Sequence, residues 1–193
     1  MLDVSLRRLM DRPLEAMAAQ ISRTPISASA LVVAGFACGL GAIGCIAAHR
    51  PLAGLGFVVV KLLLEGTSAP LARITGQSPL TAYLGVIFDF LVRAGIPLAF
   101  ALADPSRALA AAFLIMSFVG TGTARLADRA FAIGDGRRSL SVPGGLIETM
   151  IVYVAFALAC LVPAWFSVLA YALGMLCFVL TGASVASAIE RLK

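Results

Sequence analysis

The stretch LLEGTSAPLARITGQSPLTAYLGVIFDFLVR (residues 63–93) decides the fold, because it joins two strongly apolar segments through a short polar turn. The apolar pattern begins near residue 52 and continues to residue 102. A helix of about 20 mostly apolar residues is long enough to cross a bilayer. The stretch therefore predicts two antiparallel membrane helices, yet it places Glu65, Asp89 and Arg93 inside apolar segments.

The composition of the whole chain is that of an integral membrane protein. Of its 193 residues, 61% are hydrophobic and 13% are charged, and the mean hydropathy is +1.00. Soluble domains contain about 25% charged residues. We expect a single all-α membrane domain over residues 1–193, with six transmembrane helices near residues 26–48, 52–71, 80–102, 106–126, 144–162 and 165–187.

The segment before the first span has the pattern of a helix on the membrane surface. In residues 1–24, apolar side chains recur at three- and four-residue spacing, and charged side chains fall on the other side. The apolar set is Leu2, Leu6, Leu9, Met10, Leu14, Met17, Ala18 and Ile21. We therefore expect an N-terminal amphipathic helix in the interface, retained in the mature protein.

The distribution of basic residues predicts the orientation. With the N-terminus inside, the opposite side holds only Arg50 and Arg107. The cytoplasmic side then holds Arg7, Arg8, Arg12, Arg23, Arg73, Arg125, Arg129, Arg137, Arg138, Arg191 and Lys193. Both termini are predicted to be cytoplasmic, in a bacterial-type inner membrane. The basic surface is expected to contact anionic lipids and not nucleic acid, because no aromatic residues are interleaved with the basic ones.

Two pairs of opposite charge lie at membrane depth. Lys61 and Glu65 stand four residues apart in the second span, and Asp89 and Arg93 stand four apart in the third. An ionised group at the bilayer centre costs about 2.5 to 3.5 kcal/mol, so such residues indicate a functional site. Residues four apart share a helix face, so each carboxylate is expected to pair with the cation one turn away. Structural ion pairs, or cations that reach along the helix toward water, are the alternatives.

Two further polar features leave alternatives open. Glu148, near the start of the fifth span, is either another residue of the same site or an interfacial carboxylate. Residues 127–143 form the one long connection, rich in Gly, Pro and charge. This connection is interpreted as a solvated loop, with an anion-binding loop as the alternative.

The stretch from Glu65 to Arg93 resembles the signature of the CDP-alcohol phosphatidyltransferases, D-x2-D-G-x2-A-R-x8-G-x3-D-x3-D. The match is anchored on Ala72-Arg73 and has a spacer of seven residues where the signature has eight. In order, the motif positions are filled by Glu65, Ser68, Ala69, Ala72, Arg73, Thr81, Gly85 and Asp89. Six spans preceded by a surface helix are also the architecture of that family.

The resemblance implies a transferase of phospholipid synthesis. In that family, aspartates hold two magnesium or manganese ions against the pyrophosphate of a CDP-linked lipid or alcohol, and the last aspartate deprotonates the alcohol that displaces CMP. Carried over, Asp89 would be the catalytic base, and Glu65 and Asp89 the metal ligands. The residues expected to contact the substrate are Ala69, Ala72, Arg73 and Thr81.

The departures from the signature predict that this metal site is vestigial. Two of its four aspartate positions hold Ser68 and Gly85. The two remaining carboxylates are balanced by Lys61 and Arg93 without any metal, and an uncompensated ion in a low-dielectric site is strongly penalised. We therefore expect magnesium or manganese to be absent or weakly bound, and Lys61 and Arg93 to take the electrostatic place of the ions.

Three functions are compatible with this pattern. One is a weakly active phosphatidyltransferase that acts on a CDP-linked lipid. Another is a non-catalytic lipid-binding or partner subunit, as a homodimer or paired with an intact paralogue. The third, a small transporter or channel, is disfavoured because the chain has no repeated interrupted helix.

Overall fold

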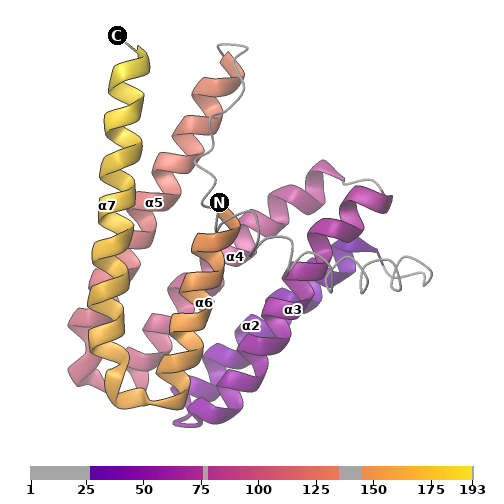
Figure 1. The fold of residues 1–193 in the computed structure, drawn as a ribbon. Coiled ribbons are helices and arrows are strands. Elements are labelled where there is room, and N and C mark those ends of the chain that lie inside the picture. Colours follow the sequence, from indigo (N-terminus) through magenta and orange to yellow (C-terminus); the bar gives the residue numbers. More distant parts are fainter. Residues whose placement is uncertain (1–26, 76–77, 135–144, 193) are drawn as a thin grey trace, which may run out of the picture.

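The structure, a computed structural model, describes residues 27–75, 78–134 and 145–192 (Figure 1). Within these ranges the regular elements are helices: α2 (Ala28–Ala47), α3 (Pro51–Thr75), α4 (Pro79–Ala103), α5 (Ala108–Gly134), α6 (Gly145–Leu161) and α7 (Phe166–Leu192). Two short 3-10 helices, η1 (Pro105–Arg107) and η2 (Pro163–Trp165), lead into α5 and α7. The all-α prediction is confirmed for these ranges. The expected surface helix over residues 1–24 lies outside them.

Within the described residues, five segments are long and apolar enough to cross a membrane, judged by length and composition. They are Ala28–Ala47, Pro51–Ser68, Pro79–Ala103, Pro105–Ala127 and Pro163–Ile189. The sixth expected span, near residues 144–162, corresponds to α6, a shorter helix of 17 residues. At 1.5 Å per residue α6 covers about 26 Å, slightly less than the hydrocarbon thickness of about 30 Å.

The expected loop over residues 127–143 is wrong in its first part, because α5 continues as a helix to Gly134. The residues that extend it, ADRAFAI (127–133), contain three alanines and an arginine, which favour helix. Glycine is a poor residue for a helix interior, and the helix ends at one. The charged residues of the segment do not prevent it from continuing the fourth span as a helix.

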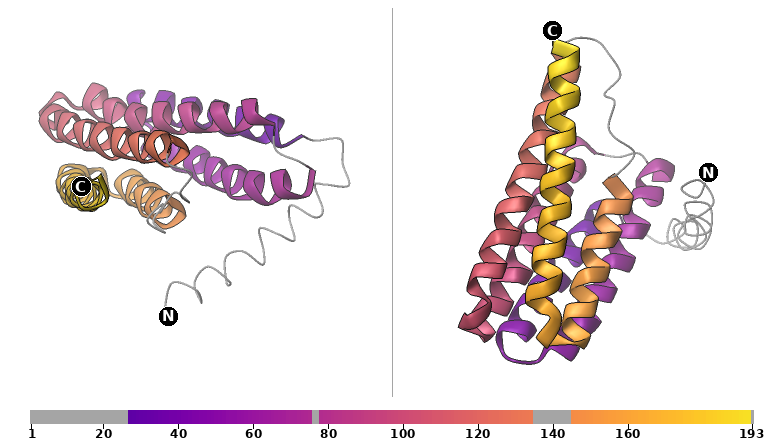
Figure 2. Two further views of the ribbon diagram at one scale, coloured as in Figure 1. Left: turned by 90° about the horizontal axis from the view of Figure 1, so that it is seen from above. Right: turned by 60° about the vertical axis from the view of Figure 1, so that its left-hand side comes forward.

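The helices form a bundle in which α3 packs against α2 and α6, and α4 packs against α2 and α5. Helices α5 and α7 run side by side, and α6 and α7 lie together on one side of the bundle (Figure 2). The core is apolar and aromatic. Phe100 of α4 stacks on Phe166 of α7, with ring centroids 4.4 Å apart.

Gly39 lies where α2 closely approaches α4, the helix that carries Asp89. A Cβ atom on Gly39 would overlap the Cγ2 atom of Val92. Small residues at such crossings let helix backbones approach closely in lipid. The side chain of Val92 is fully buried at this contact, one residue before Arg93.

Candidate functional site

The second span places Lys61 and Glu65 one turn apart on the face of α3 that looks into the bundle. The ammonium of Lys61 donates to Oε1 of Glu65, so the ion pair expected from the spacing is present. The Lys61 side chain is only 1% exposed, whereas that of Glu65 is 26% exposed. The cation therefore lies deeper in the protein than its carboxylate.

The third span repeats this arrangement with Asp89 and Arg93 on α4. An Nη nitrogen of Arg93 lies 2.7 Å from Oδ2 of Asp89, which is the second expected pair. The side chain of Arg93 is 5% exposed and that of Asp89 is 22% exposed. Again the cation is the more deeply buried partner.

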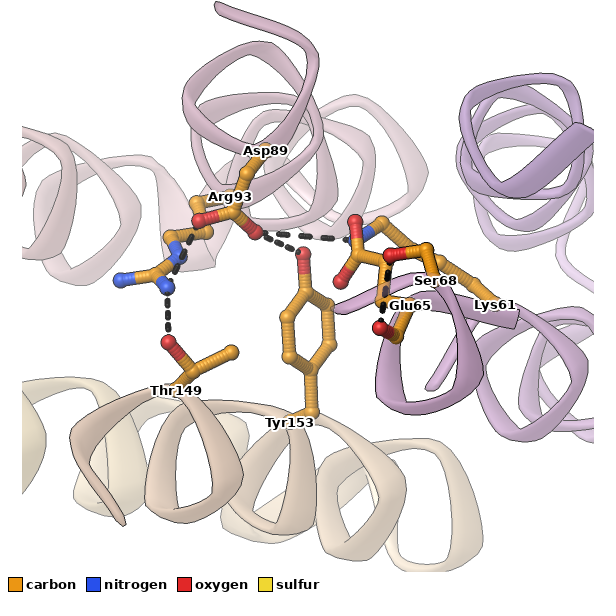
Figure 3. A network of polar contacts seen from close by, with 7 residues as sticks. All are labelled: Lys61, Glu65, Ser68, Asp89, Arg93, Thr149 and Tyr153. Carbon is orange, nitrogen blue, oxygen red and sulfur yellow. Dashed lines mark hydrogen bonds and ion pairs between the residues drawn. The ribbon is translucent and has the colours of Figure 1, made fainter. Parts of the chain in front are cut away.

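Further contacts join these pairs across three helices (Figure 3). The amino group of Lys61 lies 3.6 Å from Oδ1 of Asp89, which links α3 to α4. From α6, the hydroxyl of Tyr153 donates to Oδ1 of Asp89 at 2.8 Å, and Arg93 donates to the hydroxyl of Thr149 at 2.5 Å. The Lys61 amino group also lies over the Tyr153 ring, 4.2 Å from its centroid, as in a cation–π contact.

We call Lys61, Glu65, Asp89, Arg93, Thr149 and Tyr153 the charge cluster. Its two carboxylates and two cations sum to zero formal charge. Both oxygens of Asp89 are engaged, Oδ1 by Tyr153 and Lys61 and Oδ2 by Arg93. No oxygen of this carboxylate is left without a donor or cation beside it.

The residues of the charge cluster do not fit a two-metal site of the kind the resemblance implies. Oε1 of Glu65 and both oxygens of Asp89 already face a buried cation, which a metal ion would have to displace. At the second aspartate position, the Ser68 hydroxyl donates to the backbone carbonyl of Glu65 at 2.9 Å. At the third, Gly85 has space for a side chain, because a Cβ there would meet only Val32 at 4.0 Å, but it has no ligand atom. Among the described residues, no three His, Cys, Asp or Glu side chains gather to hold a metal.

Of the other expected substrate contacts, only the side chain of Thr81 is described by the structure, and it lies outside the charge cluster. Thr81 is 4% exposed, and its hydroxyl shares a 2.5 Å hydrogen bond with Ser29 of α2, so it lies in the α2–α4 interface. The side chains of Ala69, Ala72, Arg73 and Glu148 lie outside the part of the chain that the structure describes.

Sequence reasoning alone misses the contribution of α6. From the sequence, Tyr153 is interpreted as a membrane anchor or packing residue, and nothing singles out Thr149. A usable signal is present, because Thr149 and Tyr153 stand four apart and so share one face of a mostly apolar helix. Their partners are 56 and 64 residues away in the chain, so only the fold identifies them.

Comparison with known proteins finds a relative over most of the chain. Inner membrane protein YnjF of Escherichia coli (strain K12) is 34% identical over 181 residues, which cover 90% of this chain and 88% of the relative. No protein-family model matches the chain, and no solved structure matches it. The composition, the five apolar helices and this likeness agree on an integral membrane protein. With this identity over nearly its whole length, the chain belongs to the same protein family as inner membrane protein YnjF.

Proposed function

We propose that this chain is an inner membrane protein with the scaffold of a CDP-alcohol phosphatidyltransferase, in which metal-dependent transfer to an alcohol is weakened or abolished. The observation that carries the proposal is the pairing of both motif carboxylates, Glu65 and Asp89, with the buried cations Lys61 and Arg93. The two cations already neutralise the carboxylate charge that metal ions would neutralise in such a site.

The proposed arrangement in the membrane has six crossings, an N-terminal surface helix and both termini in the cytoplasm. The excess of basic residues on one side supports this orientation. Helix α6 contains 17 residues, about 26 Å at 1.5 Å per residue, and it packs on α3 and α7. A helix of this length is at the lower limit for a span and is compatible with a crossing buried among neighbours.

The geometry around Asp89 supports a loss of transfer activity. A general base must receive the proton of the alcohol, so it needs an oxygen that is available to the substrate. Here Oδ1 accepts from the Tyr153 hydroxyl and Oδ2 faces the Arg93 guanidinium. Proton transfer to Asp89 would also leave Arg93 without its neutralising carboxylate in a buried position, which is costly.

A second candidate function is a non-catalytic lipid-binding or partner subunit, either as a homodimer or beside an intact paralogue. The charge cluster favours this function, because it connects α3, α4 and α6 as a structural ion-pair network does. Buried polar networks of this kind hold helices in one arrangement when every member is satisfied.

A CMP-release assay tests the proposal. The purified protein in lipid vesicles would receive CDP-diacylglycerol, a panel of alcohols and manganese, beside an intact enzyme of the family as positive control. We expect CMP release at the background level, equal in the wild type and in Asp89→Asn. The matched control is Asp104→Asn, a carboxylate at the other end of α4. Manganese-dependent release at the rate of the intact enzyme, which Asp89→Asn abolishes and Asp104→Asn preserves, would refute the proposal.

A further inference from the structure

A second polar site lies at the other end of the bundle, where the α2–α3, α4–α5 and α6–α7 turns meet (Figure 1). A cavity of about 310 Å³ opens there, with Ile46, Phe100 and Ala103 among its apolar lining and His49, Asp104 and Arg107 as its polar residues. Asp89 precedes Ala103 by 14 residues on α4, which is about 21 Å along the helix axis. The cavity is therefore separate from the charge cluster.

His49 holds an unusual backbone conformation at this cavity. It follows α2 with a φ of 59°, in the left-handed region that favours glycine. The amide of His49 donates to the carbonyl of Ile46 and the amide of Arg50 donates to that of Cys45, which is the Schellman pattern of helix ends. Glycine would suit this backbone, yet the position carries an imidazole that lines the cavity.

Arg107 is held in place at the same cavity by Asp104. The Nε of Arg107 lies 3.0 Å from Oδ2 of Asp104, and Oδ1 accepts from the amide and the hydroxyl of Ser106 at 3.1 and 2.7 Å. This contact uses one edge of the guanidinium, and two planar amino groups remain for another acceptor. Guanidinium groups bind phosphate through such paired donors. The side chain is 21% exposed, so a ligand can reach it.

The charges and the lining indicate the class of ligand. The lining carries one cation, Arg107, and one carboxylate, Asp104, which contacts the guanidinium only through its Nε. The lining below the rim is mostly apolar, as in pockets that bury the apolar part of a ligand and orient its polar part. The turns that form the rim end membrane-spanning helices, where lipid phosphates lie.

We propose that this cavity binds an anionic phospholipid. Its phosphodiester contacts Arg107 and His49, and the adjoining glycerol and acyl carbons enter the apolar lining beside Phe100 and Ala103. This site is independent of the function proposed for the charge cluster, because it uses other residues at the other end of the bundle.

Native mass spectrometry tests the proposal with two lipids of matched acyl chains, phosphatidylglycerol and phosphatidylcholine, added to the detergent-purified protein. We expect the wild type to retain phosphatidylglycerol in preference. In Arg107→Gln, the preference for phosphatidylglycerol over phosphatidylcholine should fall roughly tenfold. This change corresponds to the loss of one charge-assisted hydrogen bond. Ala103→Leu, which keeps every charge and fills the apolar lining, should also lose it. Arg50→Gln removes one positive charge on the same side of the bundle, at a residue that does not line the cavity, and as the matched control it should bind as the wild type does.

Two further measurements distinguish lipid binding from a folding defect and from binding of a free phosphate ester. A thermal unfolding curve for each variant identifies a folding defect, and Arg107→Lys retains the charge if Arg107→Gln fails to fold. Competition by soluble glycerol phosphate tests whether the phosphate ester suffices without acyl chains. Equal preference for phosphatidylglycerol in wild type, Arg107→Gln and Ala103→Leu would overturn the proposal, and so would full competition by glycerol phosphate at the lipid's own concentration.

Discussion

The amino group of Lys61 on α3 lies 3.6 Å from Oδ1 of Asp89 on α4, and this contact joins two ion pairs into one cluster. Each pair alone connects residues of a single helix turn. With the hydrogen bond from Tyr153, the network of charged and polar groups extends over three helices. Removing one charged member should therefore affect groups on helices other than its own.

Charge removal at Asp89 and Arg93 is expected to be non-additive. Asp89→Asn leaves Arg93 without its carboxylate, and Arg93→Met leaves Asp89 with less compensation. Breaking a buried pair costs about 3 to 5 kcal/mol, and Asp89 is 22% exposed, so the lower end is expected. The double variant should cost less than the sum of the two single variants. Unfolding in mixed detergent micelles measures all four proteins, and strict additivity would show that the two residues do not interact.

Tyr153 should stabilise the protein through its hydroxyl and through its ring. Tyr153→Phe loses the 2.8 Å hydrogen bond to Asp89, and bonds to charged groups contribute about 1.5 to 3 kcal/mol. Tyr153→Leu also loses the ring below Lys61, so it should be less stable than Tyr153→Phe. Tyr171→Phe, at a tyrosine that is 40% exposed, is the control and should unfold as the wild type does. Equal unfolding midpoints for Tyr153→Phe and wild type would contradict this role.

The i, i+4 spacing is sufficient to predict both ion pairs, because residues four apart on a helix must share a face. It cannot predict the link from Lys61 to Asp89 or the contacts of Thr149 and Tyr153. Those depend on how α3, α4 and α6 are rotated against one another, which side-chain packing sets. The Gly, Pro and charge content that predicts a loop over residues 127–143 is misleading for residues 127–134, because charge marks the edge of a membrane and does not mark the end of a helix.

Restoring the missing carboxylates should create a metal site. Ser68→Asp and Gly85→Asp supply ligands at the two empty motif positions, and Lys61→Gln with Arg93→Gln removes the competing cations. Gly85 has room for the new side chain, because a Cβ there meets only Val32 at 4.0 Å. The quadruple variant should bind manganese saturably in equilibrium dialysis, and the wild type should not. Equal manganese binding by both proteins would contradict the charge-balance account.

The conformation of His49 predicts a ranking of variants. At a φ of 59°, a β-branched side chain is strongly disfavoured and glycine is not. His49→Val should lower the free energy of unfolding by at least about 1 kcal/mol. His49→Gly should unfold close to the wild type, since relief of strain is offset by the greater freedom of glycine in the unfolded chain. Thermal midpoints that place the Val variant level with the Gly variant would exclude the left-handed conformation.

Asp104 predicts an acid-dependent loss of stability. Hydrogen bonds from the Ser106 hydroxyl and amide, aided by Arg107, hold the pKa of this carboxyl below its usual range. A carboxyl with a lowered folded-state pKa stabilises the fold above its unfolded pKa of about 3.9, and this contribution is lost as the pH falls through the folded value. Thermal midpoints measured from pH 6 downward should fall more steeply below about pH 4 in the wild type than in Asp104→Asn. Parallel curves for the two proteins would contradict this role of Asp104.

The most direct test of the charge balance is an experimental structure of the protein in manganese, with anomalous scattering recorded at the metal edge. The account predicts no anomalous peak beside Glu65 and Asp89, with the Lys61 ammonium and the Arg93 guanidinium against the two carboxylates. One or two strong peaks at ligand distance from both carboxylates, with the Lys61 and Arg93 side chains turned away, would contradict it.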